Sequence, residues 1–150
     1  MLTAERTGFW GGKYTLTEDG RPVTVWDSHW WTSGGSFDLA GRTYTVKSNA
    51  WGSRFTMFDD GGHVVAEAER VGKRNWAVLA GGHTYRFQRP SFLSSDHHLM
   101  DGERTVGVIK RTSAWTGSYA ADLPGLPQPV QVFTLGVLMA QAQAAAAAAA

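Results

Sequence analysis

Short runs of alternating apolar and polar residues recur along this chain. The clearest run places Val64, Ala66 and Ala68 on one face and Val65, Glu67 and Glu69 on the other. A period of two is typical of a half-buried β-strand. Because the apolar face carries small side chains, we expect a bulky element to pack against it.

The alternating runs belong to a repeat of 41 residues. An Asp-Gly dipeptide, which favours a tight turn between two strands, marks each copy at Asp19, Asp60 and Asp101. Residues 41–51 also match residues 82–92 at this spacing. The three imperfect copies cover residues 1–40, 41–81 and 82–123.

Each copy divides into four short strands. In the second copy they cover residues 42–47, 53–59, 63–70 and 75–80. On the small apolar face of the third strand we expect Val23 and Val25 in the first copy, and Thr105, Gly107 and Ile109 in the third. Four strands in each of three copies predict a mainly-β fold, a twelve-stranded antiparallel β-barrel that closes on itself.

The C-terminal part of the chain does not repeat and predicts a helix. The Pro-rich segment 124–129 interrupts the sheet pattern, and Pro129 suits the first turn of a helix. Apolar residues of the segment 130–143 are spread around the whole helical circumference, which indicates burial on all sides. We therefore expect a central helix filling the barrel, whose interior is too wide for strand side chains alone.

The chain is expected to form one domain of 150 residues. The apolar stretch 130–140 is shorter than the roughly 20 residues that cross a bilayer, so no transmembrane span is expected. The final segment 144–150 is an alanine run of low complexity that either extends the helix or specifies no packing position.

Composition narrows the function classes. The net charge is +1, with 14 basic and 13 acidic residues, so no overall field favours nucleic acid. The chain contains no cysteine, which excludes disulfides and thiolate chemistry and fits the cytoplasm. No export signal is recognised at the N-terminus. Any charged partner must therefore be met by a local patch.

Several segments resemble the tubby C-terminal-like superfamily, which includes the LURP-one-related proteins and the phospholipid scramblases. The segments that carry the resemblance are residues 44–47, 55–62, 100–103 and 126–138, and the resemblance covers nearly the full chain. The resemblance implies a twelve-stranded barrel around a central helix. It also implies phosphoinositide binding or lipid movement as candidate functions, although no cysteine-rich palmitoylation segment or acidic calcium loop is present and no family binding residue can be transferred.

A candidate binding surface comes from the connections between the third and fourth strands. Equivalent connections of an up-and-down barrel gather at one end, and these combine tryptophan with basic residues. The candidate residues are Trp30, Trp31, Arg70, Lys73, Arg74, Lys110, Arg111 and Trp115. Tryptophan beside Lys and Arg suits a membrane interface. The alternative is that Trp30 and Trp31 pack across the barrel mouth while the charges are simply solvated.

Catalytic and metal-binding patterns are not apparent. Asp96, His97, His98 and Asp101 lie close in sequence, but adjacent residues of a strand point to opposite faces, which argues against a shared metal site. The chain has no Gly-x-Ser-x-Gly elbow, P-loop or dinucleotide fingerprint. We therefore expect no enzyme, no metal and no cofactor.

Three functional hypotheses remain open at this point. The first is a peripheral, lipid-responsive membrane module that binds anionic phospholipid through the tryptophan and basic residues. The second is a cytoplasmic scaffold whose aromatic surface binds a protein partner. The third is a carrier of a small apolar ligand, which requires the C-terminal helix to lie outside the barrel.

Overall fold

The computed structural model describes residues 1–7, 12–29, 34–113 and 117–149, and these form twelve strands and one helix. The strands are β1 (Leu2–Thr7), β2 (Lys13–Glu18), β3 (Arg21–His29), β4 (Gly34–Leu39), β5 (Arg42–Ser48), β6 (Phe55–Phe58), β7 (Val64–Glu69), β8 (Asn75–Ala80), β9 (His83–Gln88), β10 (His97–Asp101), β11 (Arg104–Ser113) and β12 (Ser118–Asp122). The helix is α1 (Gln128–Ala149). The predicted mainly-β fold is confirmed.

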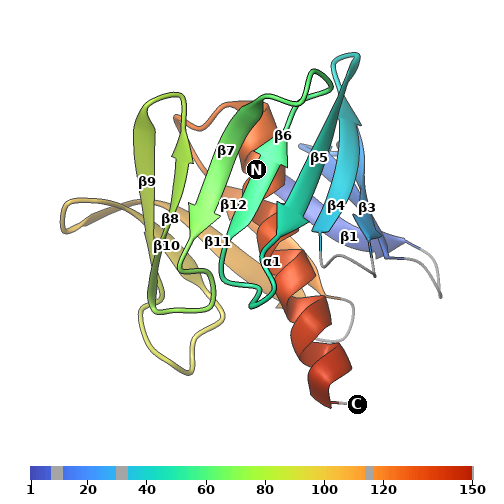
Figure 1. The fold of residues 1–150 in the computed structure, drawn as a ribbon. Helices are drawn as coiled ribbons and strands as arrows, with labels where there is room; N and C mark the ends of the chain where they lie inside the picture. The colour runs from blue at the N-terminus through green and yellow to red at the C-terminus, as the bar shows by residue number, and fades with distance from the viewer. Residues whose placement is uncertain (8–11, 30–33, 114–116, 150) are drawn as a thin grey trace.

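Each strand pairs antiparallel with its neighbours in sequence, and β1 pairs with β12 to close the barrel. The closing register places Leu2 opposite Ala121 and Ala4 opposite Tyr119. Among the described strands, each therefore has a paired neighbour on both sides, so none is an edge strand. The connections 49–54, 70–74 and 89–96 all lie at one end of the barrel, which we call the loop end (Figure 1). Tight turns join the strands at the opposite end, the turn end.

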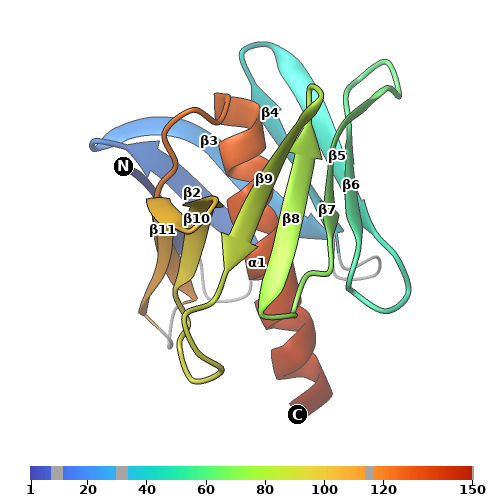
Figure 2. The same cartoon turned by 90° about the vertical axis from the view of Figure 1, so that its left-hand side faces the viewer.

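Helix α1 enters at the turn end, passes through the barrel and protrudes at the loop end (Figures 1 and 2). Residues 132–140 are all buried, so the helix is enclosed on every side, as its sequence predicted. The buried hydroxyl of Thr134 donates to the carbonyl of Val130 at 2.7 Å, which satisfies its polar atom within the helix. The predicted central helix is therefore confirmed.

The helix is longer than the predicted segment 130–143. It begins two residues earlier, at Gln128, and Pro129 lies in its first turn, where no backbone donor is needed. It continues to Ala149 because alanine has the highest helix propensity of all residues. Residues 144–146 are exposed, so this last part of the helix projects beyond the barrel.

Three equivalent β-bulges set which side chains face the helix. Pairing slips by one residue beside Val23, Val65 and Val106, so each of these valines is the extra residue of its strand. All three are partly buried and pack against the core. The bulge is the third residue of β3 and of β11 and the second residue of β7, so it recurs near the start of the third strand of each copy.

The bulges correct the predicted face of the third strand in every copy. Ala66, Ala68, Gly107 and Ile109 face inward as expected, but Val64 and Thr105 precede their bulges and are exposed. In the first copy the face is reversed: Trp26 is fully buried and Val25 is 46% exposed. In the first copy Glu18 pairs with Arg21, so the two turn residues are Asp19 and Gly20. In the third copy Asp101 pairs with Arg104, so the turn lies one repeat position later, at Gly102 and Glu103. This one-residue slip exchanges the two faces of a strand.

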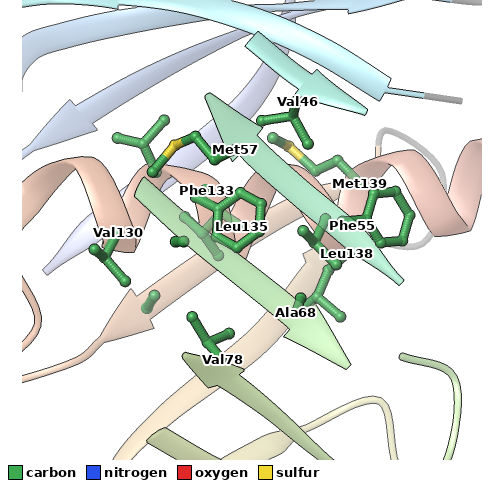
Figure 3. Packing of buried hydrophobic residues seen from close by; sticks show 14 of the residues in the cluster. Val46, Phe55, Met57, Ala68, Val78, Val130, Phe133, Leu135, Leu138 and Met139 are labelled. Carbon is green, nitrogen blue, oxygen red and sulfur yellow. The ribbon is translucent and has the colours of Figure 1, made fainter. Parts of the chain in front are cut away.

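The expected bulky partner of the small face is the helix itself. Ala68 of β7 lies beside Leu138 of α1, and Phe55 and Met57 of the neighbouring strand β6 lie along the same part of the helix (Figure 3). Val78 of β8 belongs to the same buried cluster. On the other side of the helix, the large Trp26 ring contacts the backbone of α1 at Gly136, where a Cβ atom would lie 2.3 Å from the ring. Small strand residues and one helical glycine therefore make room for the central helix.

Candidate functional site at the loop end

The loop end contains the described connections 49–54, 70–74 and 89–96 together with the emerging part of α1. Gly72 lies so close to the helix that an added Cβ would be 2.5 Å from Nε2 of Gln141. The side-chain amide of Gln143 donates to the Tyr14 hydroxyl at 3.3 Å. These contacts fix the position of the helix where it leaves the barrel.

The structure separates the predicted site residues. Trp30, Trp31 and Trp115 lie outside the described residues. Arg70, Lys73 and Arg74 lie together in the connection between β7 and β8 and are exposed at the loop end. Lys110 and Arg111 are adjacent in β11 and therefore point to opposite faces. Lys110 is exposed on the outside, whereas Arg111 lies over the ring of Tyr119 at the barrel mouth, with 6.0 Å from Cζ to the ring centroid.

Three exposed apolar side chains at the loop end were not among the predicted site residues. Trp51 is 88% exposed in the connection 49–54, and Phe92 and Leu93 are 77% and 100% exposed in the connection 89–96. Trp51 and Phe92 occupy the same position of the 41-residue repeat, as does Trp10, which lies outside the described residues. Interaction surfaces are marked by contiguous exposed apolar side chains, and these three, on two loops at one end of the barrel, are the candidates for such a surface here.

Two arginines hold the connection 89–96 in place. Arg89 donates from Nε to the Ser94 carbonyl and from Nη2 to the carbonyls of Phe92 and Ser94, at 2.8–3.2 Å. Arg74 donates to the carbonyls of Arg89 and Pro90 at 3.2 and 3.3 Å. Since these bonds hold four carbonyls of the loop, Phe92 and Leu93 are presented outward from a backbone that is fixed in place.

The connection 49–54 is fixed in a different way. The side-chain oxygen of Asn49 accepts hydrogen bonds from the backbone N–H groups of Ser53 and Arg54, at 3.0 and 3.1 Å. The N–H of Val71 donates to the carbonyl of Ser53 at 3.0 Å, which joins this loop to the connection 70–74. Trp51 takes part in none of these hydrogen bonds, so they hold the loop without its exposed side chain.

Charge is distributed unequally between the two ends of the barrel. The described connections at the loop end carry Arg54, Arg70, Lys73, Arg74 and Arg89 against one carboxylate, Asp96, and Arg54 forms an ion pair with Glu69 of β7 at 3.2 Å. The turn end carries Asp19, Asp59, Asp60 and Glu103 in its connections, with neither Lys nor Arg. The positive charge of the loop end and the negative charge of the turn end nearly cancel in the net charge of +1. The basic loop end favours an anionic partner.

His97 faces the barrel mouth beside this surface. Its Nδ1 accepts a hydrogen bond from Nε1 of Trp76 at 3.0 Å, and the two rings meet edge to face. Because the indole is only a donor, the neutral imidazole carries its proton on Nε2. Burial, reinforced by the nearby charge of Arg89, lowers the pKa of His97 to about 4. His97 is therefore a neutral donor near pH 7.

Two tyrosines line the same mouth. Burial raises the pKa of both Tyr14 and Tyr119, against the opposing charges of Arg6 and Arg111 at Tyr14 and of Arg111 at Tyr119. Both hydroxyls are therefore neutral near pH 7.

His97 and His98 lie on opposite faces of β10, opposite Ile109 and Val108 of β11, as strand alternation requires.

Among the described residues, no group of three or more potential ligands could hold a metal ion. The described part of the chain also has no helix that is both long and apolar enough to cross a bilayer. Comparisons with protein-family models, with curated proteins and with solved structures found no match.

Proposed function

We propose that this chain is a tubby-like, non-enzymatic domain that binds anionic phospholipid bilayers reversibly through its loop end. One observation carries the proposal. Trp51, Phe92 and Leu93 project from two fixed loops that stand beside a group of basic residues. The tubby-like resemblance of the sequence and the closed barrel around a C-terminal helix agree with this assignment.

The energetics suit a peripheral module. Burying a large apolar side chain is worth about 1.5–3 kcal/mol. Each Lys or Arg near an anionic surface adds about 1 kcal/mol, and salt weakens that contribution. Three apolar tips and exposed cations such as Arg70 and Lys73 therefore supply enough free energy for reversible association. Both contributions come from residues that the barrel does not need for its own core.

The two alternative functions are distinguished by the surface and by the helix. A carrier of an apolar ligand needs an empty barrel interior, whereas α1 fills that interior. A protein partner would use the same aromatic and basic residues. However, because the turn end is acidic and the loop end is basic, an anionic membrane surface would orient the barrel with its loop end towards the membrane. We therefore propose a cytoplasmic domain that associates peripherally with the membrane.

Sedimentation with lipid vesicles tests the proposal. Purified protein is mixed with phosphatidylcholine vesicles, with and without phosphatidylserine, at low and high salt. The test variant is Trp51→Ala/Phe92→Ser/Leu93→Ser, which removes the tips without touching the bonds that hold the loops. The matched control is Val64→Ser, which removes an exposed apolar side chain near the turn end. Circular dichroism checks that both variants fold.

We expect the parent protein and Val64→Ser to sediment with anionic vesicles in a salt-sensitive way. The triple variant should remain in the supernatant. Absence of binding to any vesicle would overturn the proposal and favour a protein partner. Equal binding by the triple variant would show that the loop tips are not the contact surface.

A further inference from the structure

A pocket of about 430 Å³ opens beside α1 at the loop end. It lies between the emerging helix, the connections 70–74 and 89–96, and the ends of β11 and β12. This pocket is separate from the apolar tips, because none of Trp51, Phe92 and Leu93 lines it. Its two walls differ in chemistry.

One wall of the pocket is cationic and rich in hydrogen-bond donors. It contains Arg89, Arg111, His97 and Tyr119, and no carboxylate lines the pocket among the described residues. Arg89 is already oriented by its bonds to the loop carbonyls. Those bonds use Nε and Nη2, and Nη1 makes no hydrogen bond to any described residue. Arg111 is positioned over the Tyr119 ring.

The opposite wall is the surface of α1. Leu138, Ala142 and Ala145 line the pocket along successive turns of the helix, with Gln141 between them. The small alanine side chains leave this strip open. A molecule that fits both walls needs an anionic group at one end and a short apolar chain at the other.

We propose that this pocket binds a small amphiphilic anion. Its carboxylate or phosphate group lies between Arg89 and Arg111, and its apolar chain lies against Ala142 and Ala145. Arginine presents planar, paired donors that match both kinds of oxyanion. The Nε2–H of neutral His97 adds a donor that does not require a third positive charge. The anion is either a free metabolite or the headgroup of a membrane lipid, which share this chemistry.

Calorimetric titration with octanoate tests the pocket without any membrane. Octanol has a similar chain without charge, and acetate has the charge without the chain. We expect octanoate to bind at least about tenfold more tightly than either, since a charge-assisted hydrogen bond and a buried short chain each exceed the energy of a tenfold change. If octanoate binds no better than octanol, the proposal is wrong.

Variants locate the binding site. Arg111→Gln should weaken octanoate binding at least about tenfold. Lys110→Gln removes the same charge from the adjacent, outward-facing residue and should leave binding unchanged. If Arg111→Gln does not fold, Ala142→Glu places a repelling carboxylate in the pocket on a partly exposed turn of the helix, with Ala144→Glu as its exposed control. Equal affinity in a test variant and its control would overturn the assignment.

Vesicle sedimentation in the presence of saturating octanoate identifies the source of the anion. If octanoate displaces the protein from anionic vesicles, the pocket takes a lipid headgroup. If octanoate binds while sedimentation is unchanged, the pocket serves a soluble anion. Both results support the pocket, and they decide whether it takes part in membrane binding. The tip variant tests the proposed membrane function separately, because its sedimentation is measured without octanoate.

Discussion

Gly136 provides a sharp test of how the helix is seated in the barrel. A Cβ atom at this position would lie 2.3, 2.5 and 2.6 Å from three carbon atoms of the Trp26 ring. Carbon atoms in contact normally lie about 3.5–4.0 Å apart, so the ring or the helix would have to move by roughly 1 Å. The ring has no free space on its other edge, because a Cβ on Gly35 would lie 2.4 Å from Cζ2 of the same indole.

Two opposing effects set the magnitude for Gly136→Ala. Replacing glycine by alanine inside a helix favours folding by about 1 kcal/mol. Overpacking a well-filled core costs about 1–3 kcal/mol, and occasionally more. Since Trp26 is confined by two glycines, we expect an overpacking cost of about 2–3 kcal/mol, in the upper part of that range, so the free energy of unfolding should fall by about 1–2 kcal/mol. Urea unfolding followed by circular dichroism measures this change.

A double variant separates the clash from any general effect of alanine. Trp26→Leu alone should be destabilising because it leaves a cavity. In that background, Gly136→Ala should become neutral or stabilising, since the ring that it would strike is gone. The cycle therefore predicts a coupling between the two positions. A Gly136→Ala protein as stable as the parent, or more so, would refute the seating of Trp26 on α1.

Three further predictions concern pH and the helix. Because the pKa of His97 is about 4 in the folded protein and about 6.5 when unfolded, the unfolded chain binds more protons between these values. Stability should therefore fall as pH decreases from about 6.5 towards 4, by up to about 3 kcal/mol. His97→Gln, which retains an acceptor for Trp76, should flatten this profile in urea unfolding at successive pH values; an unchanged slope would contradict the assignment. Removal of residues 144–150 should change the unfolding free energy by less than about 0.5 kcal/mol, since residues 144–146 are exposed, and a larger loss would assign the tail to the core. Removal of residues 130–150 should abolish the β-sheet circular dichroism signal, whereas a folded product would show that the barrel does not need its helix.

The repeat predicted most of the fold because turns, strand periodicity and spacing agree with one another. Twelve strands and a central helix follow from three copies of one pattern. The prediction of which residues face inward in the third strand of the first copy was wrong, because a spacing of 41 residues does not show which two residues form the turn. Moving the turn by one residue exchanges Val25 and Trp26 between the two faces.

The candidate surface was predictable only in part. The basic connection 70–74 was identified from its position in the repeat, whereas the separation of Lys110 from Arg111 depends on strand register. Trp51 and Phe92 were aligned by the repeat, but large aromatic side chains are usually buried, and nothing in the sequence showed that these two are exposed. The pocket beside α1 joins residues from four elements, which no local pattern could bring together.

The most direct test of membrane binding places a probe at each end of the barrel. The chain has no cysteine, so Leu93→Cys at the loop end and Asp60→Cys at the turn end can each be labelled at one site with an environment-sensitive fluorophore. On addition of anionic vesicles, we expect a blue shift and increased intensity for the label at residue 93 and an unchanged spectrum for the label at residue 60. An unchanged spectrum at residue 93, or an equal shift at both sites, would contradict insertion of the loop end into the bilayer surface.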